Sequence, residues 1–165
     1  MRIALIVLAV LLGLVLLVAL IGWSLPVKHR VTREAALKVP AETLFALIAT
    51  PLEFPKWRTG VKSVEILPSV GGLPSWVEHS SDGNIAFAVT RSVPGVELVT
   101  TIADKSLPFG GSWTYELIPA GPLTTLRITE DGEVYNPIFR FLSRFIFGHA
   151  ATIERYLKDV QRRVG

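Results

Sequence analysis

An uninterrupted apolar run near the N-terminus constrains this chain more than any other feature. Ile3 to Trp23 contains no charged residue. A helix of about 20 residues crosses a hydrocarbon core of about 30 Å, and Trp23 stands where an aromatic residue is favoured at the membrane surface. Pro26 then ends the helix. We therefore expect residues 1–26 to be a single-pass membrane anchor, and residues 27–165 to be one globular domain.

Two other interpretations of the apolar run are less consistent with it. A cleaved signal peptide has a shorter apolar region of about 7–15 residues and a small-x-small cleavage site, which Ile21-Gly22-Trp23 does not provide. A core helix that is apolar on every face is hard to bury in so small a protein. The flanking charges set the orientation, because Lys28, Arg30 and Arg33 outnumber Arg2. This excess favours a cell-membrane protein whose domain faces the cytoplasm.

The composition excludes several classes of function. The net charge of +3 is mild, and the sequence has no clustered basic stripe of the kind that binds nucleic acid. The absence of Cys excludes disulfides, thiolate nucleophiles and cysteine-based zinc sites. The three His residues lack the spacing of metal ligands. We expect no metal, no cofactor and no nucleic-acid partner, and the sequence indicates no oligomeric state.

Beyond the anchor, the pattern predicts one strand, two short helices, about six strands and one long helix. His29 to Leu37 alternates as a strand does, and Pro40 opens a first short helix, which Pro51 ends. Phe54 to Trp57 forms a second short helix or turn. Turn residues every 8–12 positions then separate strand candidates, as in an antiparallel meander. These candidates are 61–67, 75–80, 84–92, 97–103, 112–118 and 123–130.

The last segment changes to a helical period. Asn136 is a good N-cap and Pro137 a good first helical residue, and Gly148 is a point at which this long helix can bend. A long antiparallel sheet curls because its strands twist, so its concave face needs a cover. We therefore predict an α+β helix-grip fold, in which a curved antiparallel sheet wraps around the C-terminal helix and leaves an apolar cavity between them.

Four blocks of residues carry a resemblance to a known family. They are Val39-Pro40-Ala41-Glu42 with Leu44 and Phe45, Phe54-Pro55-Lys56-Trp57, the block from Pro108 to Leu117, and the block from Thr129 to Pro137. Across residues 28–163 the chain resembles the SRPBCC superfamily of START-like, helix-grip proteins, in its polyketide cyclase/dehydrase and lipid-transport branch. The resemblance implies a hydrophobic cavity that binds lipids, sterols, polyketides or similar molecules. Members of this superfamily include carriers, sensors and a few cyclases.

The candidate site residues follow from the strand and helix faces. Glu130 shares a face with Leu126 and Ile128, so its carboxyl would lie at the cavity mouth and act as an acid or base. His149 falls on the apolar stripe of the terminal helix. The residues expected to line the cavity are Trp57, Trp76, Phe87, Trp113, Tyr115, Glu130, Phe141, Phe145 and His149. A solvated strand end for Glu130, a core position for His149 and plain core for the aromatic residues are the simpler alternatives.

We expect the protein to be a binding module rather than an enzyme. It would take a hydrophobic or amphipathic ligand, lipid-like or polyketide-like, into the cavity, with the membrane as its other partner. One alternative is a cyclase-like or hydrolase-like enzyme that uses Glu130 or His149 as acid or base. Another is a structural or partner-binding membrane protein without a ligand.

Overall fold

The computed structural model describes residues 2–81 and 83–165, and it places a seven-stranded sheet at the centre of the molecule. Helices and strands follow one another in the predicted order. Their bounds are α1 (Arg2–Ser24), β1 (Lys28–Leu37), α2 (Ala41–Ile48), η1 (Pro51–Lys56), β2 (Val61–Val70), β3 (Leu73–Ser80), β4 (Gly83–Val93), β5 (Glu97–Ile102), β6 (Phe109–Ala120), β7 (Leu123–Val134), α3 (Pro137–Leu142), η2 (Ser143–Phe147) and α4 (Ala151–Val164).

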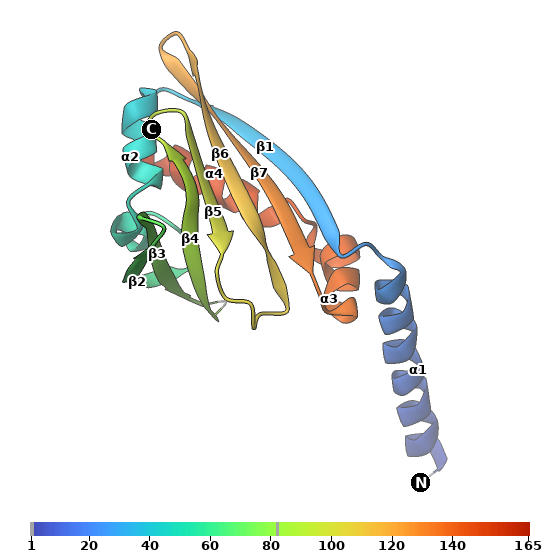
Figure 1. The fold of residues 1–165 in the computed structure, drawn as a ribbon. Helices are drawn as coiled ribbons and strands as arrows, with labels where there is room; N and C mark the ends of the chain where they lie inside the picture. Colours follow the sequence, from blue (N-terminus) through green and yellow to red (C-terminus); the bar gives the residue numbers. More distant parts are fainter. Residues whose placement is uncertain (1, 82) are drawn as a thin grey trace.

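The sheet is the predicted antiparallel meander, with one strand added at its edge. The strand order is β1-β7-β6-β5-β4-β3-β2, and every neighbouring pair is antiparallel. Strands β2 to β7 follow each other in sequence and lie side by side, whereas β1 pairs with β7. Figure 1 shows the sheet curving around α4, which crosses one of its faces. The predicted helix-grip fold is confirmed.

The core lies between the inner face of the sheet and α4. Leu126 and Ile128 are two residues apart on β7 and are fully buried, because side chains on a strand alternate between its faces. Ile153, Leu157 and Val160 bury the facing stripe of α4 at helical spacing. Burial of apolar surface at about 25 cal/mol per Å² makes this contact the main source of stability.

The C-terminal segment differs from the single long helix that the sequence indicates. Asn136 caps α3 as expected, because its side chain accepts hydrogen bonds from the backbone N–H groups of Ile138 and Phe139. However, α3 has only six residues, and a π-helical turn, η2, follows it. Gly148 then has φ 75°, a left-handed conformation that ends the turn before α4 begins at Ala151. His149 therefore lies in the connection between η2 and α4 rather than on a helix.

The apolar helix α1 stands apart from the sheet (Figure 1). It has 23 residues, and none of its most apolar stretch is buried. It ends at Ser24, just before Pro26, as the sequence predicts. A core helix would be covered by the rest of the chain, so the buried-helix interpretation is wrong. By length and composition α1 suits a membrane span, and a signal sequence would pass the same test.

Candidate functional site

The inner face of the sheet carries an aromatic cluster that includes most of the predicted cavity residues. The Trp76 ring stacks on Phe87 with centroids 5.8 Å apart, and Trp113 lies 5.7 Å from Tyr156 of α4. Trp57 contacts the same Tyr156 ring at 5.4 Å. Tyr115 is also buried among these rings. The structure thus brings together Trp57, Trp76, Phe87, Trp113 and Tyr115.

A buried ion pair lies within this cluster. An Nη1 nitrogen of Arg58 donates to Oε1 of Glu78 over 2.5 Å, and the indole N–H of Trp76 donates to the same oxygen over 3.1 Å. The Arg58 guanidinium also lies between the rings of Phe54 and Tyr156, at 4.8 and 5.1 Å from their centroids. Cation–π contacts of this kind stabilise a desolvated guanidinium.

The pKa shifts follow from this burial. Burial disfavours the charged form of Arg58, but the Glu78 carboxylate together with Tyr156 and Tyr115 outweighs that effect and raises the pKa of Arg58 above its usual value. Burial raises the pKa of Tyr115 to about 12, and it also raises the pKa of Tyr156. Near neutral pH Arg58 therefore stays charged and both tyrosines stay neutral. These groups stabilise the interior rather than exchanging protons.

A second polar cluster lies at the other side of the inner face and joins both predicted acid–base residues. The Nε2 atom of His29 is 3.2 Å from Oε1 of Glu130, and the His29 ring stacks on His149 with centroids 3.9 Å apart. Trp113 lies directly across from Glu130 on β6. Gly132 makes room for this arrangement, because a Cβ atom there would lie 2.3 Å from Cε1 of His29.

Glu130 is the unusual member of this second cluster. Its Oε2 atom is buried and has no hydrogen-bond partner among the described residues. Burial raises the pKa of Glu130 above its usual value, and the hydrogen bond and charge of His29, together with the Trp113 indole N–H, oppose the shift. For His149, burial lowers the pKa, and the charges of His29 and Arg144 add to that effect. The cluster thus holds a carboxyl with a free acceptor oxygen beside two imidazoles.

The structure places the two phenylalanines of the terminal segment differently from the other predicted cavity residues. Phe141 and Phe145 contact each other, with ring centroids 5.0 Å apart. Phe145, however, is 59% exposed and does not join the inner-face cluster. The cause is the π turn with Gly148, which replaces the continuous helix that would have turned this ring toward the sheet.

Several members of these clusters, among them His29, Glu78 and Tyr156, were not among the expected lining residues, although each had a signal in the sequence. His29 stands two residues before Val31, and Glu78 two residues after Trp76, so the period of a strand places both on the inner face. Tyr156 lies on α4 among apolar residues, where a core position was indicated. The pairing of β1 with β7, which brings His29 to Glu130, has no local signal in the sequence.

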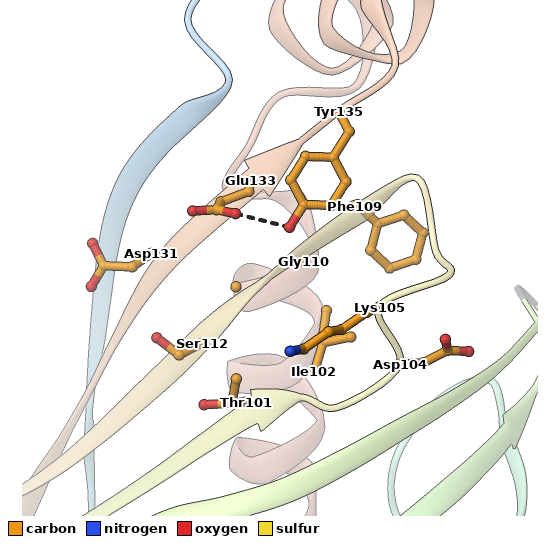
Figure 2. A pocket seen from close by; sticks show the side chains of 11 residues that line it. Thr101, Ile102, Asp104, Lys105, Phe109, Gly110, Ser112, Asp131, Glu133 and Tyr135 are labelled. Atoms are coloured by element: carbon orange, nitrogen blue, oxygen red, sulfur yellow. Dashed lines mark hydrogen bonds between the residues drawn. The ribbon is translucent and has the colours of Figure 1, made fainter.

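One hollow lies on the outer face of the sheet, lined by β6, β7 and the connection after β5. It has a volume of about 550 Å³, and its lining includes Lys105, Ser112, Asp131, Glu133 and Tyr135. Figure 2 shows these side chains gathered from β6, β7 and the connection after β5. The hydroxyl of Tyr135 donates to Glu133 over 2.8 Å, which lowers the pKa of that carboxyl. Lys28 and Arg30 pair with Glu133 and Asp131.

A smaller hollow of about 320 Å³ lies beside Trp57, Arg58 and Arg162. In the inner-face region where the sequence predicts a cavity, aromatic rings pack against one another and around the Arg58–Glu78 pair. Within residues 2–81 and 83–165, no group of three or more His, Asp or Glu side chains is placed to hold a metal ion.

Comparisons with known proteins agree with the fold. The family model for "polyketide cyclase / dehydrase and lipid transport" matches residues 28–164. Among solved structures, a START superfamily protein from Mycobacterium smegmatis is 21% identical with a TM-score of 0.67, covering 82% of this chain and 97% of its own. A protein from Thermus thermophilus is 20% identical over the same shares, with a TM-score of 0.67.

Norcoclaurine synthase from Thalictrum flavum is 11% identical, with a TM-score of 0.64 and coverage of 84% of this chain and 87% of its own. Identities this low establish a shared fold and nothing more. No curated protein matches the chain.

Proposed function

The chain belongs to the polyketide cyclase/dehydrase and lipid-transport family, and we propose that it is a membrane-anchored module that binds an amphipathic small molecule. The family fold supports a ligand-binding role. In this proposal residues 1–26 are the anchor and residues 27–165 the binding domain. The ligand places its polar end at Glu130 and its apolar part against the aromatic inner face.

The free oxygen of Glu130 is the observation that carries the proposal. A buried acceptor without a hydrogen bond costs about 1–3 kcal/mol, and Oε2 is such an acceptor. A ligand hydroxyl or amine that donates to Oε2 would recover that free energy. The apolar part of the ligand gains about 25 cal/mol for each Å² it removes from water. One polar group that fixes orientation beside an apolar surface is the usual composition of a small-molecule site.

The position of the site supports a ligand drawn from the membrane. His29 follows the end of α1 by only five residues, and Glu130 lies near the end of β7 that leads into α3. With so short a connection, the domain stays close to the membrane surface. Because Lys28, Arg30 and Arg33 follow α1 and only Arg2 precedes it, the positive-inside rule favours the cytoplasmic side for this domain.

In this proposal a ligand reaches Glu130 only when its cover moves, because Oε2 of Glu130 is buried and the His149 ring stacks on His29. The cover over the His29–Glu130 cluster is the irregular segment from η2 to His149, whose ring rests on His29. Short irregular segments open at lower free energy than packed helices and strands. Movement of this segment exposes Glu130 and Trp113 without disturbing the Arg58–Glu78 pair.

The test uses the full chain in nanodiscs and a fatty alcohol that carries a dansyl group at its far end. Energy transfer from tryptophan to dansyl should saturate for the wild type. Glu130→Leu should weaken binding by about tenfold, the effect of about 1.4 kcal/mol from one lost hydrogen bond. Asp131→Asn, its neighbour on the outer face, should leave binding unchanged. The methyl ether of the probe lacks the donor and should bind wild type and Glu130→Leu equally.

Two results would contradict the proposal. Absence of saturable transfer would remove the binding function. Saturable binding that Glu130→Leu and Asp131→Asn weaken to the same small extent would place the ligand elsewhere. Urea unfolding of each variant shows whether a loss of binding reflects a loss of folding.

The Glu130–His29 pair also favours a second candidate, an acid–base enzyme. A carboxyl whose pKa is raised by burial and that lies beside an imidazole can accept or donate a proton. If the protein converts a bound molecule, Glu130→Gln and His149→Ala should each slow conversion while binding persists. Conversion that survives both substitutions would exclude this candidate.

A further inference from the structure

We propose that residues 138–147, in α3 and η2, form a second membrane contact that inserts apolar side chains into the bilayer surface beside α1. This inference rests on the proposed role of α1 as a membrane anchor. It assigns a docking surface to a segment that the proposed function treats only as the cover of the site. The occupant of the surface is the lipid bilayer itself.

The segment exposes an unusual concentration of large apolar side chains. Phe145, Ile146 and Phe147 are consecutive and are 59%, 63% and 66% exposed, and Ile138 and Phe139 are 38% and 49% exposed. Single exposed apolar residues are ordinary on protein surfaces, whereas a contiguous group indicates an interaction site. Elsewhere in the described part of the domain, large exposed apolar residues do not occur three in a row.

Tight contacts fix α3 against the end of α1. Gly22 is buried, and a Cβ atom there would overlap the carbonyl group of Pro137. The Arg140 guanidinium donates to the carbonyl oxygens of Leu25 over 2.8 Å and Trp23 over 3.4 Å. These carbonyl groups lie at the C-terminal end of α1, where a helix favours a cation. Figure 1 shows α3 beside this end of α1.

The length of α1 places this junction at the membrane surface. Its 23 residues extend about 34 Å at about 1.5 Å per residue, slightly more than a hydrocarbon core of about 30 Å. Gly22 lies within the last turn, so a spanning α1 sets it at the boundary between hydrocarbon and headgroups. Pro137, in contact with Gly22, must lie at the same level. The apolar side chains that follow on α3 and η2 therefore have lipid within reach.

The side chains of residues 138–147 are of the types that are favoured at the boundary between hydrocarbon and headgroups. Phenylalanine and isoleucine bury favourably at the boundary of the acyl chains, and aromatic residues mark membrane interfaces. Arg144 is exposed within the segment, and its long side chain can extend to a lipid phosphate while its stem stays among apolar groups. Binding of a protein partner or of a second copy of the chain would not require α3 and η2 to lie level with the end of α1.

The experiment uses the full chain in phosphatidylcholine vesicles. Because the chain contains no Cys, single cysteines carry the fluorophore NBD without background labelling. The test positions are Ile146→Cys and Phe139→Cys. Val70→Cys is the matched control, since Val70 is 61% exposed and Ile146 63%, but Val70 lies on β2 at the opposite edge of the sheet from β1. Leu12→Cys, in the middle of α1, reports the anchor.

Nitroxide-labelled lipids should quench NBD at positions 146 and 139 several-fold more strongly than at position 70. Iodide dissolved in the water should quench NBD more strongly at position 70 than at positions 146 and 139. Strong lipid quenching at position 12 with none at 146 and 139 would overturn the membrane contact while leaving the anchor in place. Labels at 146 and 139 that are shielded from both quenchers would also overturn it, because a protein would then cover the surface. Absence of lipid quenching at position 12 would instead refute the anchor.

Discussion

The buried pair of Arg58 and Glu78 offers the sharpest test of how the interior is held together. We consider Glu78→Gln, which removes one charge and keeps the shape of the side chain. In the fold, the Glu78 side chain is only 9% exposed and that of Arg58 19%. The carboxylate also accepts the Trp76 indole N–H. The substitution therefore leaves a guanidinium in an aromatic interior without its counter-ion.

The expected magnitude follows from the cost of an uncompensated buried charge. Breaking a buried ion pair by removing one partner destabilises a protein by about 3–5 kcal/mol. The cation–π contacts with Phe54 and Tyr156 remain, and they offset about 1 kcal/mol or more of this cost. We therefore expect a loss of about 2–4 kcal/mol in the free energy of unfolding. That is a large share of the roughly 5–15 kcal/mol of a typical domain.

The assay is urea unfolding of the full chain in detergent, followed by tryptophan fluorescence. With a slope of about 1–3 kcal/mol per M, the midpoint should fall by about 1 M or more at an unchanged slope. Glu154→Gln is the matched control, because Glu154 forms an exposed pair with Arg33 and should lose less than about 1 kcal/mol. Equal midpoint shifts for the two variants would refute the reasoning, and the Arg58–Glu78 pair would then be solvated in solution.

Three further predictions test other parts of the structure. The pKa of Glu130 is raised from its usual 4.5, so the native state holds this proton more tightly than the unfolded chain does. The protonated Glu130 therefore stabilises the fold at low pH, and this stabilisation is lost as the pH rises above 4.5. Glu130→Gln should abolish this pH-dependent loss of unfolding free energy, measured in unfolding curves at a series of pH values. Gly22→Leu should separate α3 from α1 and speed proteolysis near Gly148, whereas Gly13→Leu, in open space, should not. Leu126→Ala should cost about 2–5 kcal/mol of unfolding free energy, because Leu126 is fully buried; a loss below about 1 kcal/mol would show a loosely packed core.

Most of the fold follows from local patterns in the sequence. Alternation places Leu126 and Ile128 on the inner face, and turn residues divide the meander correctly, since each pattern reflects a physical period. The cap at Asn136 is equally local. These features depend on residues within a few positions of one another. That is why the order of strands and the place of the last helix could be predicted.

The arrangement of the candidate site depends on contacts that local patterns do not encode. The sequence indicates Glu130 and His149 separately, but His29 joins them only because β1 pairs with β7 about a hundred residues away in sequence. Likewise, Gly148 allows either a bend or a break in a helix, and packing decides between them. The break turns Phe145 to the surface and brings His149 onto His29. The role of these residues in binding stays a prediction.

Glu78 and Glu130, the acidic groups of the inner face, differ in a way that bears on where the proposed ligand should bind. Glu78 accepts two hydrogen bonds, one of them from the Arg58 cation. A ligand that displaced these partners would break as many hydrogen bonds to Glu78 as it formed. The Oε2 atom of Glu130 has no hydrogen-bond partner among the described residues, and its neighbour His29 stacks on His149 in the connection between η2 and α4, so in the proposed binding mode a donor that reaches Oε2 displaces no hydrogen bond. The free-energy gain therefore favours the Glu130 end of the inner face. That end adjoins α3 and η2, so the proposed lipid-like ligand and its polar contact lie on the same side of the domain in this proposal.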